Sequence, residues 1–180
     1  MKLVHLTLAA VSTSLAAGAF AADYVIDPAH SSVNFTAGHL GISKTVGRFN
    51  EFEGTFSDDA DNANASIVIQ AASIDTNHPD RDKHLRSPDF FDVKQYPTLT
   101  FKTNTFTTDK LTGVLTMHGK SKPVELDVTL IGEGEDPWGG YRKGYQATTT
   151  INRSEWGITY FIPGVPDEIE IEIQIEGIRK

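Results

Sequence analysis

Residues 168–176 have the sequence EIEIEIQIE, in which every second position is isoleucine. Ile169, Ile171, Ile173 and Ile175 alternate with acidic or amide residues. Successive side chains of an extended chain point to opposite faces, so this period of two predicts a β-strand with one buried and one solvent-exposed face. The alternation is cleaner here than anywhere else in the chain, and it sets the pattern to look for in the other segments.

Shorter alternating runs precede this strand. Turns separate most of them, and they occupy residues 24–26, 32–37, 44–56, 66–71, 98–106, 111–117, 124–130 and 145–151. About eight such strands predict an all-β fold with an antiparallel sheet. Closure of the sheet into a β-barrel would remove the edge strands, which otherwise tend to pair with other chains. We expect residues 132–144, which include Trp138, to form a loop.

The strand at residues 44–56 changes its pattern in the middle. Phe49 lies on one face of the strand, whereas Phe52 and Phe56 lie on the other. A β-bulge, which inserts one residue and bends the strand as barrel closure requires, would account for the change. The alternative is a strand that is buried on both faces.

Residues 73–93, SIDTNHPDRDKHLRSPDFFDV, have the pattern of a helix rather than of a strand. Asn77 or His78 can cap its start, and Pro79 suits the first helical position, where a missing N–H costs nothing. Acidic residues follow in the first turn and basic residues near the end, as the helix dipole favours. We therefore expect one short helical segment near residues 79–92, lying as a flap or plug over the barrel. The apolar residues that must be buried against the barrel are Leu85, Phe90 and Phe91.

Composition limits the class of protein. The chain has 180 residues, of which 39% are hydrophobic and 22% charged, enough for one domain with a real core. It has no cysteine, which excludes disulfides, thiolate chemistry and cysteine metal sites. The formal net charge of -8 argues against binding to nucleic acid and against electrostatic docking on anionic lipid.

Residues 1–21 have the features of a Sec-type signal peptide. Lys2 supplies the positive charge, a moderately apolar stretch follows, and the sequence AFA ending at Ala21 fits the small-x-small cleavage rule. Polar residues interrupt the apolar stretch, which disfavours the alternative of a retained membrane anchor. We expect cleavage after Ala21, a single domain at residues 22–180, and export. The lack of disulfides favours the bacterial periplasm.

Sequence motifs for catalysis are missing. The chain has no G-x-S-x-G, HExxH or P-loop motif. His30 adjoins two serines, but a catalytic triad is a spatial arrangement that adjacency does not establish. His78 and His84 are six residues apart, so on a helix they point about 120° away from each other, whereas two metal ligands on one helical face are better four apart. We expect no catalytic residue, no metal site and no cofactor.

Several segments together resemble a known family. They are DPAHSSVNF at 27–35, HLGISKTVGRF at 39–49, DTNHPDRDKHLRSPDFFD at 75–92, TGVLTMHGKSKPVELDVTLIG at 112–132 and DPWGG at 136–140. They resemble the YceI-like polyisoprenoid-binding family, and the resemblance covers residues 23–180. Its most specific part is the helical segment, followed by Tyr96 and Pro97.

The resemblance implies both a fold and a ligand class. Members of the family form an extended, lipocalin-like antiparallel β-barrel with a helical segment, and many are periplasmic. They hold a long isoprenoid chain, of the polyprenyl diphosphate or isoprenoid quinone type, in an elongated apolar pore. This implies transport, storage or sequestration of a lipid rather than catalysis. The alternative hypothesis is a periplasmic enzyme or stress-response protein that acts on a small amphiphilic substrate.

Candidate site residues follow from alternation, size and charge. The candidates for the apolar pore are Phe35, Phe49, Phe56, Leu99, Phe101, Leu115 and Trp156. The candidates for the rim or for a headgroup contact are Arg48, Arg81, His84, Arg86 and Trp138, the last of which could equally be a structural anchor. The expected partners are an isoprenoid lipid and, transiently, a membrane as its source. A homodimer is compatible with the sequence, and nucleic acid is not.

Overall fold

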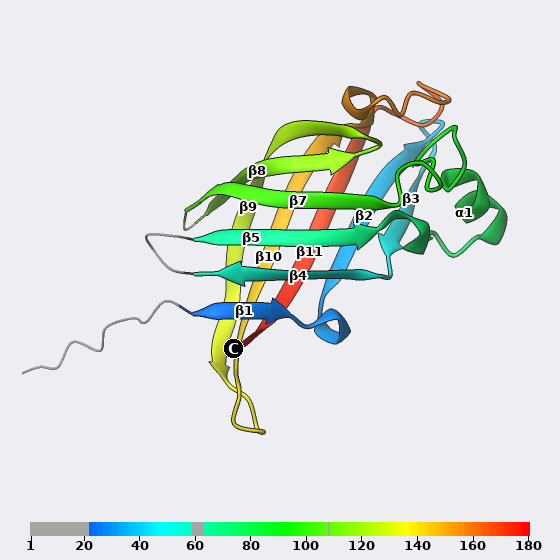
Figure 1. Ribbon diagram of the computed structural model, residues 1–180. Coiled ribbons are helices and arrows are strands. Elements are labelled where there is room, and N and C mark those ends of the chain that lie inside the picture. Colours follow the sequence, from blue (N-terminus) through cyan, green and yellow to red (C-terminus); the bar gives the residue numbers. More distant parts are fainter. Residues whose placement is uncertain (1–21, 59–62, 108) are drawn as a thin grey trace, which may run out of the picture.

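The computed structural model describes residues 22–58, 63–107 and 109–180, and the predicted signal peptide at residues 1–21 lies outside them. No helix within the described residues has the length and apolarity needed to cross a membrane. The strands (Figure 1) are β1 (Asp23–Ile26), β2 (Ser32–His39), β3 (Ser43–Phe49), β4 (Phe52–Ser57), β5 (Asn64–Gln70), β6 (Ile74–Asp75), β7 (Thr98–Phe106), β8 (Lys110–Met117), β9 (Lys120–Glu135), β10 (Tyr141–Asn152) and β11 (Glu168–Arg179).

These strands form one antiparallel sheet that closes on itself. β1 pairs with β4 along one edge and with β11 along the other. Between these contacts the order around the sheet is β4, β5, β7, β8, β9, β10, β11. Apart from β2, β3 and the short β6, which lie outside this ring, neighbours around the sheet follow one another along the chain, as in an up-and-down barrel. The predicted all-β fold, a closed antiparallel barrel of eight strands with one short helix, is confirmed.

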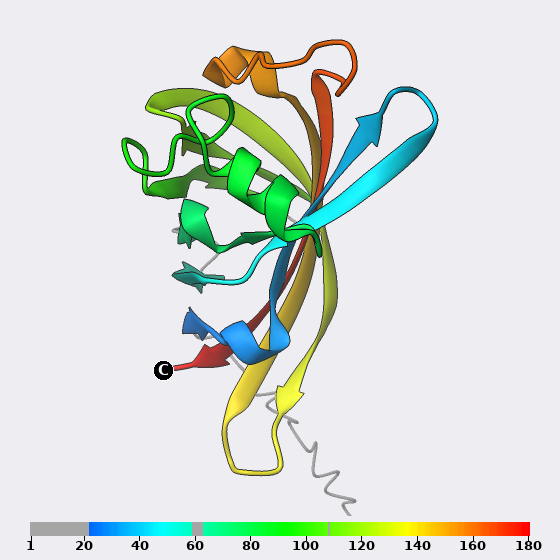
Figure 2. The same cartoon turned by 90° about the vertical axis from the view of Figure 1, so that its right-hand side faces the viewer.

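Three of the barrel strands are interrupted, and their continuations extend the wall at one end. The 3₁₀ helix η1 (Pro28–His30) separates β1 from β2, and η2 (Ala71–Ser73) separates β5 from β6. β2 pairs with β11 and β3, and β3 also pairs with the short β6. Figure 2 shows the β2–β3 hairpin leaning away from the barrel beyond these interruptions.

The third interruption is the predicted change of pattern between Phe49 and Phe52. β3 ends at the first residue and β4 begins at the second, and both side chains are buried, as is that of Phe56. The two residues between them, Asn50 and Glu51, are exposed and belong to neither strand. Their backbone hydrogen bonds to Ser73 and Gln70 continue the pairing. One extra residue between Phe49 and Phe52 shifts the alternation by one position. All three rings therefore point inward. The alternative of a strand buried on both faces is wrong.

The β9–β10 hairpin is longer than the sequence suggested. We expected a loop at residues 132–144, but β9 runs to Glu135 and β10 starts at Tyr141, so the turn is confined to residues 136–140. The prediction was wrong because glycine and glutamate interrupt the apolar alternation there. Backbone pairing continues nonetheless, with a register shift at Gly144, and Figure 1 shows the hairpin projecting beyond the barrel.

The predicted helix α1 (Pro79–Leu85) starts at the expected residue and ends well before residue 92. His78 caps its start by accepting a hydrogen bond from the Arg81 backbone N–H at 3.3 Å. Turns follow the helix, and among them Phe90 is buried in the core. Leu85 and Phe91 pack against the same core, so this segment covers the barrel as the apolar pattern predicted.

Polar contacts hold the flap in place on both sides of α1. Asp82 is buried and accepts hydrogen bonds from the backbone N–H and the hydroxyl of Thr76, at 2.8 and 2.5 Å. The Arg86 guanidinium donates to the carbonyl oxygens of Ala72 and Ile74, at 2.7 and 2.5 Å. A side chain in the middle of the helix and one just after its end therefore attach it to residues 72–76.

The chain between β10 and β11 closes the same end of the barrel. It starts with the 3₁₀ helix η3 (Arg153–Trp156), whose Trp156 is 1% exposed and donates its indole N–H to the Leu115 carbonyl oxygen at 3.1 Å. Arg153 is 4% exposed, and burial lowers the pKa of its guanidinium. That guanidinium donates to four backbone carbonyl oxygens at 2.7 to 3.0 Å, those of Ile158, Tyr160, Val165 and Pro166.

We expect Arg153→Met to lower the free energy of unfolding by about 3 kcal/mol, because it leaves these carbonyl acceptors without their donors. Chemical denaturation followed by circular dichroism measures this change. The matched control is Arg48→Met on the exposed outer face of β3, which should cost less than about 0.5 kcal/mol. Equal losses in the two variants would contradict the assignment.

Candidate functional site

The interior of the barrel contains a cavity of about 140 Å³. Side chains from all the barrel strands line it, and no charged side chain of the described residues does. Asn64, Tyr145 and Thr149 are the lining residues with a polar group. The others are Ile26, Val33, Phe56, Ala65, Ile67, Ile69, Leu99, Phe101, Phe106, Leu111, Leu115, Met117, Val124, Leu126, Val128, Ala147, Ile151, Ile171, Ile173 and Ile175.

This cavity suits an apolar group of limited size. A cavity of about 150 Å³ with such a lining stays dry and admits a molecule as large as benzene, so the interior has room for about one five-carbon isoprene unit. Aromatic rings occupy much of the remaining space. A Cβ atom at Gly113 would lie 2.5 Å from the Phe101 ring, and one at Gly177 would lie 2.4 Å from the Phe56 ring. Aromatic rings from neighbouring strands thus occupy the space beside the glycines of the wall.

A packed layer closes the cavity towards α1. It contains Trp156, Ile74 and Phe49, all of them buried, together with Phe91. The Phe49 ring meets the Phe91 ring edge-on with their centroids 5.7 Å apart, and it lies 5.8 Å from that of Phe35. These contacts join β2, β3, the flap and η3 into one apolar cluster across the end of the barrel.

A groove of about 710 Å³ lies outside this layer. The β2–β3 hairpin, α1 and the segment after η3 form its walls, and it shares no lining residue with the interior cavity. Its apolar part includes Phe35, Phe90, Tyr160 and Phe161. Its basic residues are His39, Lys44, Arg81 and His84, and no carboxylate of the described residues lines it.

Neighbouring groups position the basic side chains of the groove. The Arg81 guanidinium donates to the hydroxyl and carbonyl oxygens of Thr76, at 2.7 and 2.6 Å. The His84 ring pairs with Asp89 at 2.9 Å and packs edge-on against Phe90 and Tyr160, with each centroid 5.1 Å away. The groove therefore combines aromatic surface with cations, as a site for an amphiphile with an anionic headgroup requires.

The seven candidate pore residues fall into three places. Phe56, Leu99, Phe101 and Leu115 line the interior cavity. Phe49 and Trp156 belong to the layer that closes it, and Phe35 lines the groove. Six of the seven lie on strands and Trp156 lies in η3. Alternation and size, by which they were chosen, do not reveal at which depth along the barrel each one lies.

The five rim candidates do not gather at one place. Arg81 and His84 line the groove. Arg48 lies on the outer face of β3, and Arg86 is used to hold the flap. Trp138 lies at the opposite end of the barrel, in the turn between β9 and β10.

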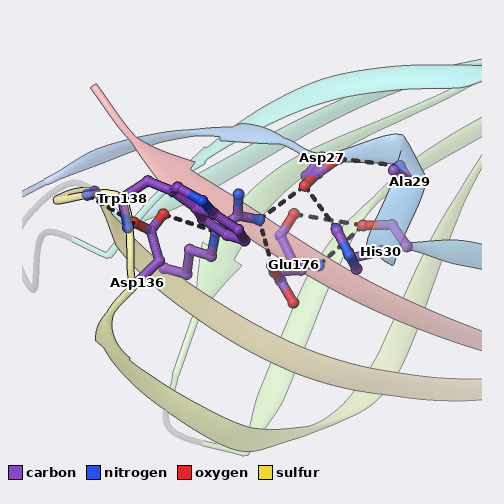
Figure 3. Close-up of polar contacts among 9 residues, drawn as sticks. Asp27, Ala29, His30, Asp136, Trp138 and Glu176 are labelled. Atoms are coloured by element: carbon purple, nitrogen blue, oxygen red, sulfur yellow. Dashed lines mark hydrogen bonds and ion pairs between the residues drawn. The ribbon is translucent and has the colours of Figure 1, made fainter.

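That opposite end contains a network centred on Arg142. The Arg142 guanidinium donates to Asp27 at 2.8 Å, to Glu176 at 2.5 Å and to Asp136 at 3.0 Å. The exposed Trp138 ring lies 6.0 Å from the guanidinium carbon, and the residues around this network are drawn in Figure 3. The network attaches the β9–β10 turn to β11 and to Asp27, the residue that caps η1, while the Trp138 side chain remains 82% exposed.

Three residues in or next to the Arg142 network have side chains that can bind a metal ion. The ligand atoms of Asp27, His30 and Glu176 lie within 4.8 Å of one another. The Arg142 guanidinium, however, already bonds to both carboxylates, and a cation between them would meet its positive charge. This geometry favours an ion-pair network over a metal site. Hydrogen bonds from Arg142 and then from His30 lower the pKa of Asp27 to about 2.

Comparison with known proteins relates this geometry to a family. The model of the YceI-like domain matches residues 24–177. The chain belongs to the YceI-like family. A UPF0312 protein of Vibrio cholerae is 44% identical over 189 aligned positions, which cover 99% of this chain and 98% of that protein. A UPF0312 protein of Pectobacterium atrosepticum is 42% identical, with 100% and 99% covered.

Solved structures share the barrel of this YceI-like domain. BcnA of Burkholderia cenocepacia has a TM-score of 0.74 at 25% identity, with 84% of this chain and 98% of that chain covered. A Campylobacter jejuni YCEI protein has a TM-score of 0.71 at 29% identity, with 79% and 90% covered. A polyisoprenoid binding domain from Saccharophagus degradans has a TM-score of 0.67 and covers 87% and 98%, but at 15% identity it shows the fold alone.

Sequence reasoning missed part of the site of this YceI-like domain. Lys44, Tyr160 and Phe161 line the groove but were not among the candidates. The signal that could have found the last two is the uncharged segment at residues 156–166, which includes three consecutive large apolar side chains at 160–162. The Arg142 network also went unrecognised, because its members are far apart in the sequence.

The Arg142 network predicts how the stability of this YceI-like domain depends on pH. The pKa of Asp27 is about 2 in the folded protein against an ordinary value of 3.8, so the unfolded chain binds more protons between these values. The stabilisation from Asp27 should therefore be complete above pH 4 and be lost as the pH falls towards 2. Urea denaturation at a series of pH values measures it.

Two variants test this assignment. Asp27→Asn should lose stability at neutral pH and show a shallower decline between pH 4 and 2 than the wild type. Arg142→Met removes the main cause of the low pKa, so the pKa of Asp27 in the folded variant should return towards 3.8 and the decline between pH 4 and 2 should be smaller than in the wild type. Identical pH slopes in the wild type and in Asp27→Asn would show that Asp27 does not carry the effect.

Proposed function

We propose that this protein binds a lipid with a long polyisoprenoid chain and holds part of that chain inside the barrel. The observation that carries the proposal is the uncharged interior cavity, whose wall is built from apolar side chains of every barrel strand. Such a wall offers no partner to a charged or strongly polar ligand, and it favours a slender hydrocarbon. The fold and the family support a binding protein rather than an enzyme.

The energetics support reversible binding. Burial of a chain away from water contributes roughly 0.8 kcal/mol per CH₂ group, so even a few isoprene units provide a large driving force. In a cell the competing environment is the membrane, which solvates the chain about as well. Net transfer from membrane to protein should then be small, as transport, temporary storage or sequestration of a lipid requires.

A chain longer than about one isoprene unit needs more room than the 140 Å³ cavity provides. The proposal therefore includes a rearrangement that joins the cavity to the groove. The layer of Phe49, Phe91 and Trp156 lies between them, and part of it belongs to the flap that carries α1. Movement of the flap would open a continuous path from the barrel interior to the groove.

The groove would receive the headgroup. Lys44, which also pairs with Glu170, and Arg81 provide positive charge there. His84 adds an imidazole, and no described carboxylate lines the groove. This combination favours a polyprenyl diphosphate over an isoprenoid quinone, because phosphate oxygens bind cations more strongly than quinone carbonyls do. A protein of the same fold from Saccharophagus degradans has the name of a polyisoprenoid binding domain, which is in keeping with the tail site proposed here.

The place of action forms part of the proposal. The features of residues 1–21 support export through a Sec-type signal peptide, and the absence of cysteine is compatible with a bacterial periplasm. There the protein would take its lipid from a membrane and release it to another acceptor, without chemical change of the ligand and without a cofactor.

Mass spectrometry of protein purified without detergent tests the tail site. We expect a prenyl chain to be released on denaturation, and we expect the delipidated protein to bind added geranylgeraniol. In Ala147→Leu, three carbons are added to the cavity wall, so binding of geranylgeraniol should weaken by about tenfold or more. Thr148→Leu, on the opposite face of β10, is the matched control and should bind as the wild type does.

The tail site would be refuted if the wild type contained no prenyl chain and bound none when it was added. Equal binding by Ala147→Leu and the wild type would place the chain outside the barrel interior.

The headgroup site predicts a difference between two ligands with the same tail. The double variant Lys44→Gln/His84→Gln should bind geranylgeranyl diphosphate about tenfold more weakly, because two charge-assisted contacts are lost. Its affinity for geranylgeraniol should not change. Lys83→Gln is the control, since Lys83 is an exposed basic residue of α1 that does not line the groove. Isothermal titration calorimetry with both ligands distinguishes a headgroup site from a general loss of binding.

A further inference from the structure

Two segments expose large apolar side chains at the α1 end of the molecule. On the β2–β3 turn Ile42 is 82% and Leu40 is 50% exposed, and on the segment after η3 Phe161 is 53% and Ile162 is 41% exposed. We call these four residues the apolar tip. Val46 and Tyr160 are also exposed on the same two segments. Most of the exposed large apolar residues in the described part of the chain therefore gather at this end.

The two segments are in direct contact. The Leu40 backbone N–H donates to the Gly164 carbonyl oxygen at 2.7 Å, and Pro166 packs against Gly38, where an added Cβ would lie 2.8 Å from the proline ring. Figures 1 and 2 both show the β2–β3 turn beside the segment that follows η3. The apolar tip is thus a single surface, even though its residues are about 120 positions apart in the sequence.

The same two segments contain no carboxylate. Residues 35–47 and 156–166 have neither Asp nor Glu, although the whole chain contains 24 of them. Lys44 is their one fully charged residue, and its ammonium group pairs with Glu170 of β11 at 2.6 Å. In a protein with a net charge of -8, this end is the part that can approach a lipid surface with the least repulsion.

We propose that the apolar tip docks on the surface of a lipid bilayer. Its side chains would enter the boundary between headgroups and acyl chains, where exposed apolar surface and aromatic side chains such as Phe161 are favoured. The weak charge of the tip predicts docking on zwitterionic bilayers that depends little on salt. This is different from the electrostatic docking on anionic lipid that the net charge disfavours.

A second copy of the chain fits the apolar tip less well than a bilayer does. Each of its side chains is partly exposed, so together they offer on the order of a few hundred Å² of surface. A stable protein interface needs about 800 Å² from each partner. The tip is also formed by two projecting turns, a shape suited to insertion in a soft surface rather than to a flat contact.

Docking at this place gives the proposed lipid exchange a direction. The apolar tip adjoins the groove, since His39, Ser43 and Phe161 line the groove while Leu40 and Ile42 stand beside it without lining it. A docked molecule would therefore hold the groove against the bilayer, next to the flap. This inference rests on the proposed function for its purpose, but the docking itself can be tested without a prenyl ligand.

The test uses the mature protein and vesicles of phosphatidylcholine in a flotation assay. The variant is Leu40→Asn/Ile42→Asp, in which asparagine suits the positive φ of 53° at position 40 and neither change touches the groove or the cavity. We expect the wild type to float with the vesicles. The partition coefficient of the variant should be lower by about tenfold or more. Ile131→Asp replaces an exposed isoleucine of β9 towards the opposite end, and it should behave as the wild type does.

Every outcome of the assay decides for or against the tip. Wild-type protein that does not float, or a variant that floats as well as the wild type, would overturn the proposal. Gel filtration that shows a wild-type dimer and a monomeric variant, with no flotation of either, would assign the tip to an interface between copies. Binding of geranylgeraniol in solution is measured in parallel. Its absence, with flotation intact, would refute the proposed function and leave the docking surface standing.

Discussion

The structure depends on the closure of one antiparallel sheet at β11. One edge of β11 pairs with β10, and the other pairs with β2 over its first half and with β1 near its end. Because β1 also pairs with β4, the sheet has no free edge between its first and last strands. Closure puts one face of every strand inside, where apolar side chains are placed at no cost and polar side chains need a hydrogen-bond partner. The uncharged cavity is a consequence of this constraint.

The closed barrel has two ends, and different interactions stabilise them. At one end Arg142 joins the β9–β10 turn to η1 and β11 through a network of carboxylates. At the other end the flap and the segment after η3 cover the barrel with aromatic side chains, and Arg153 holds that segment by bonding to its carbonyl groups. The first end is fixed by charge pairs. The second is closed by apolar packing, which can separate and re-form without breaking ion pairs.

Under the proposed function, this difference favours exchange of the ligand at the α1 end. The cavity, the layer above it, the groove and the apolar tip follow one another in that direction, and each offers apolar surface to the next. Lys44 and Arg81 add positive charge at the level of the groove, and His84 adds an imidazole there. A lipid that moved along this series would leave a bilayer tail-first and keep its headgroup close to the cations. The conformational cost of the path would lie in the layer of Phe49, Phe91 and Trp156 and in the hydrogen bonds of Asp82 and Arg86 that hold the flap.

The sequence by itself determined the class of fold, the inward faces and the place of the helix. Alternation such as that of residues 168–176 depends only on the geometry of an extended chain, and the cap at His78 and Pro79 is equally local. The sequence also contained the change of period between Phe49 and Phe52. The extent of the β9–β10 hairpin was not predictable from it, because pairing continues there without an apolar face. Tertiary structure alone decided the depth of each inward residue, the gathering of Arg81 and His84 with Lys44, and the joining of Leu40 to the segment around Phe161. These depend on the register and bending of strands that are distant in the chain, and no local pattern records them.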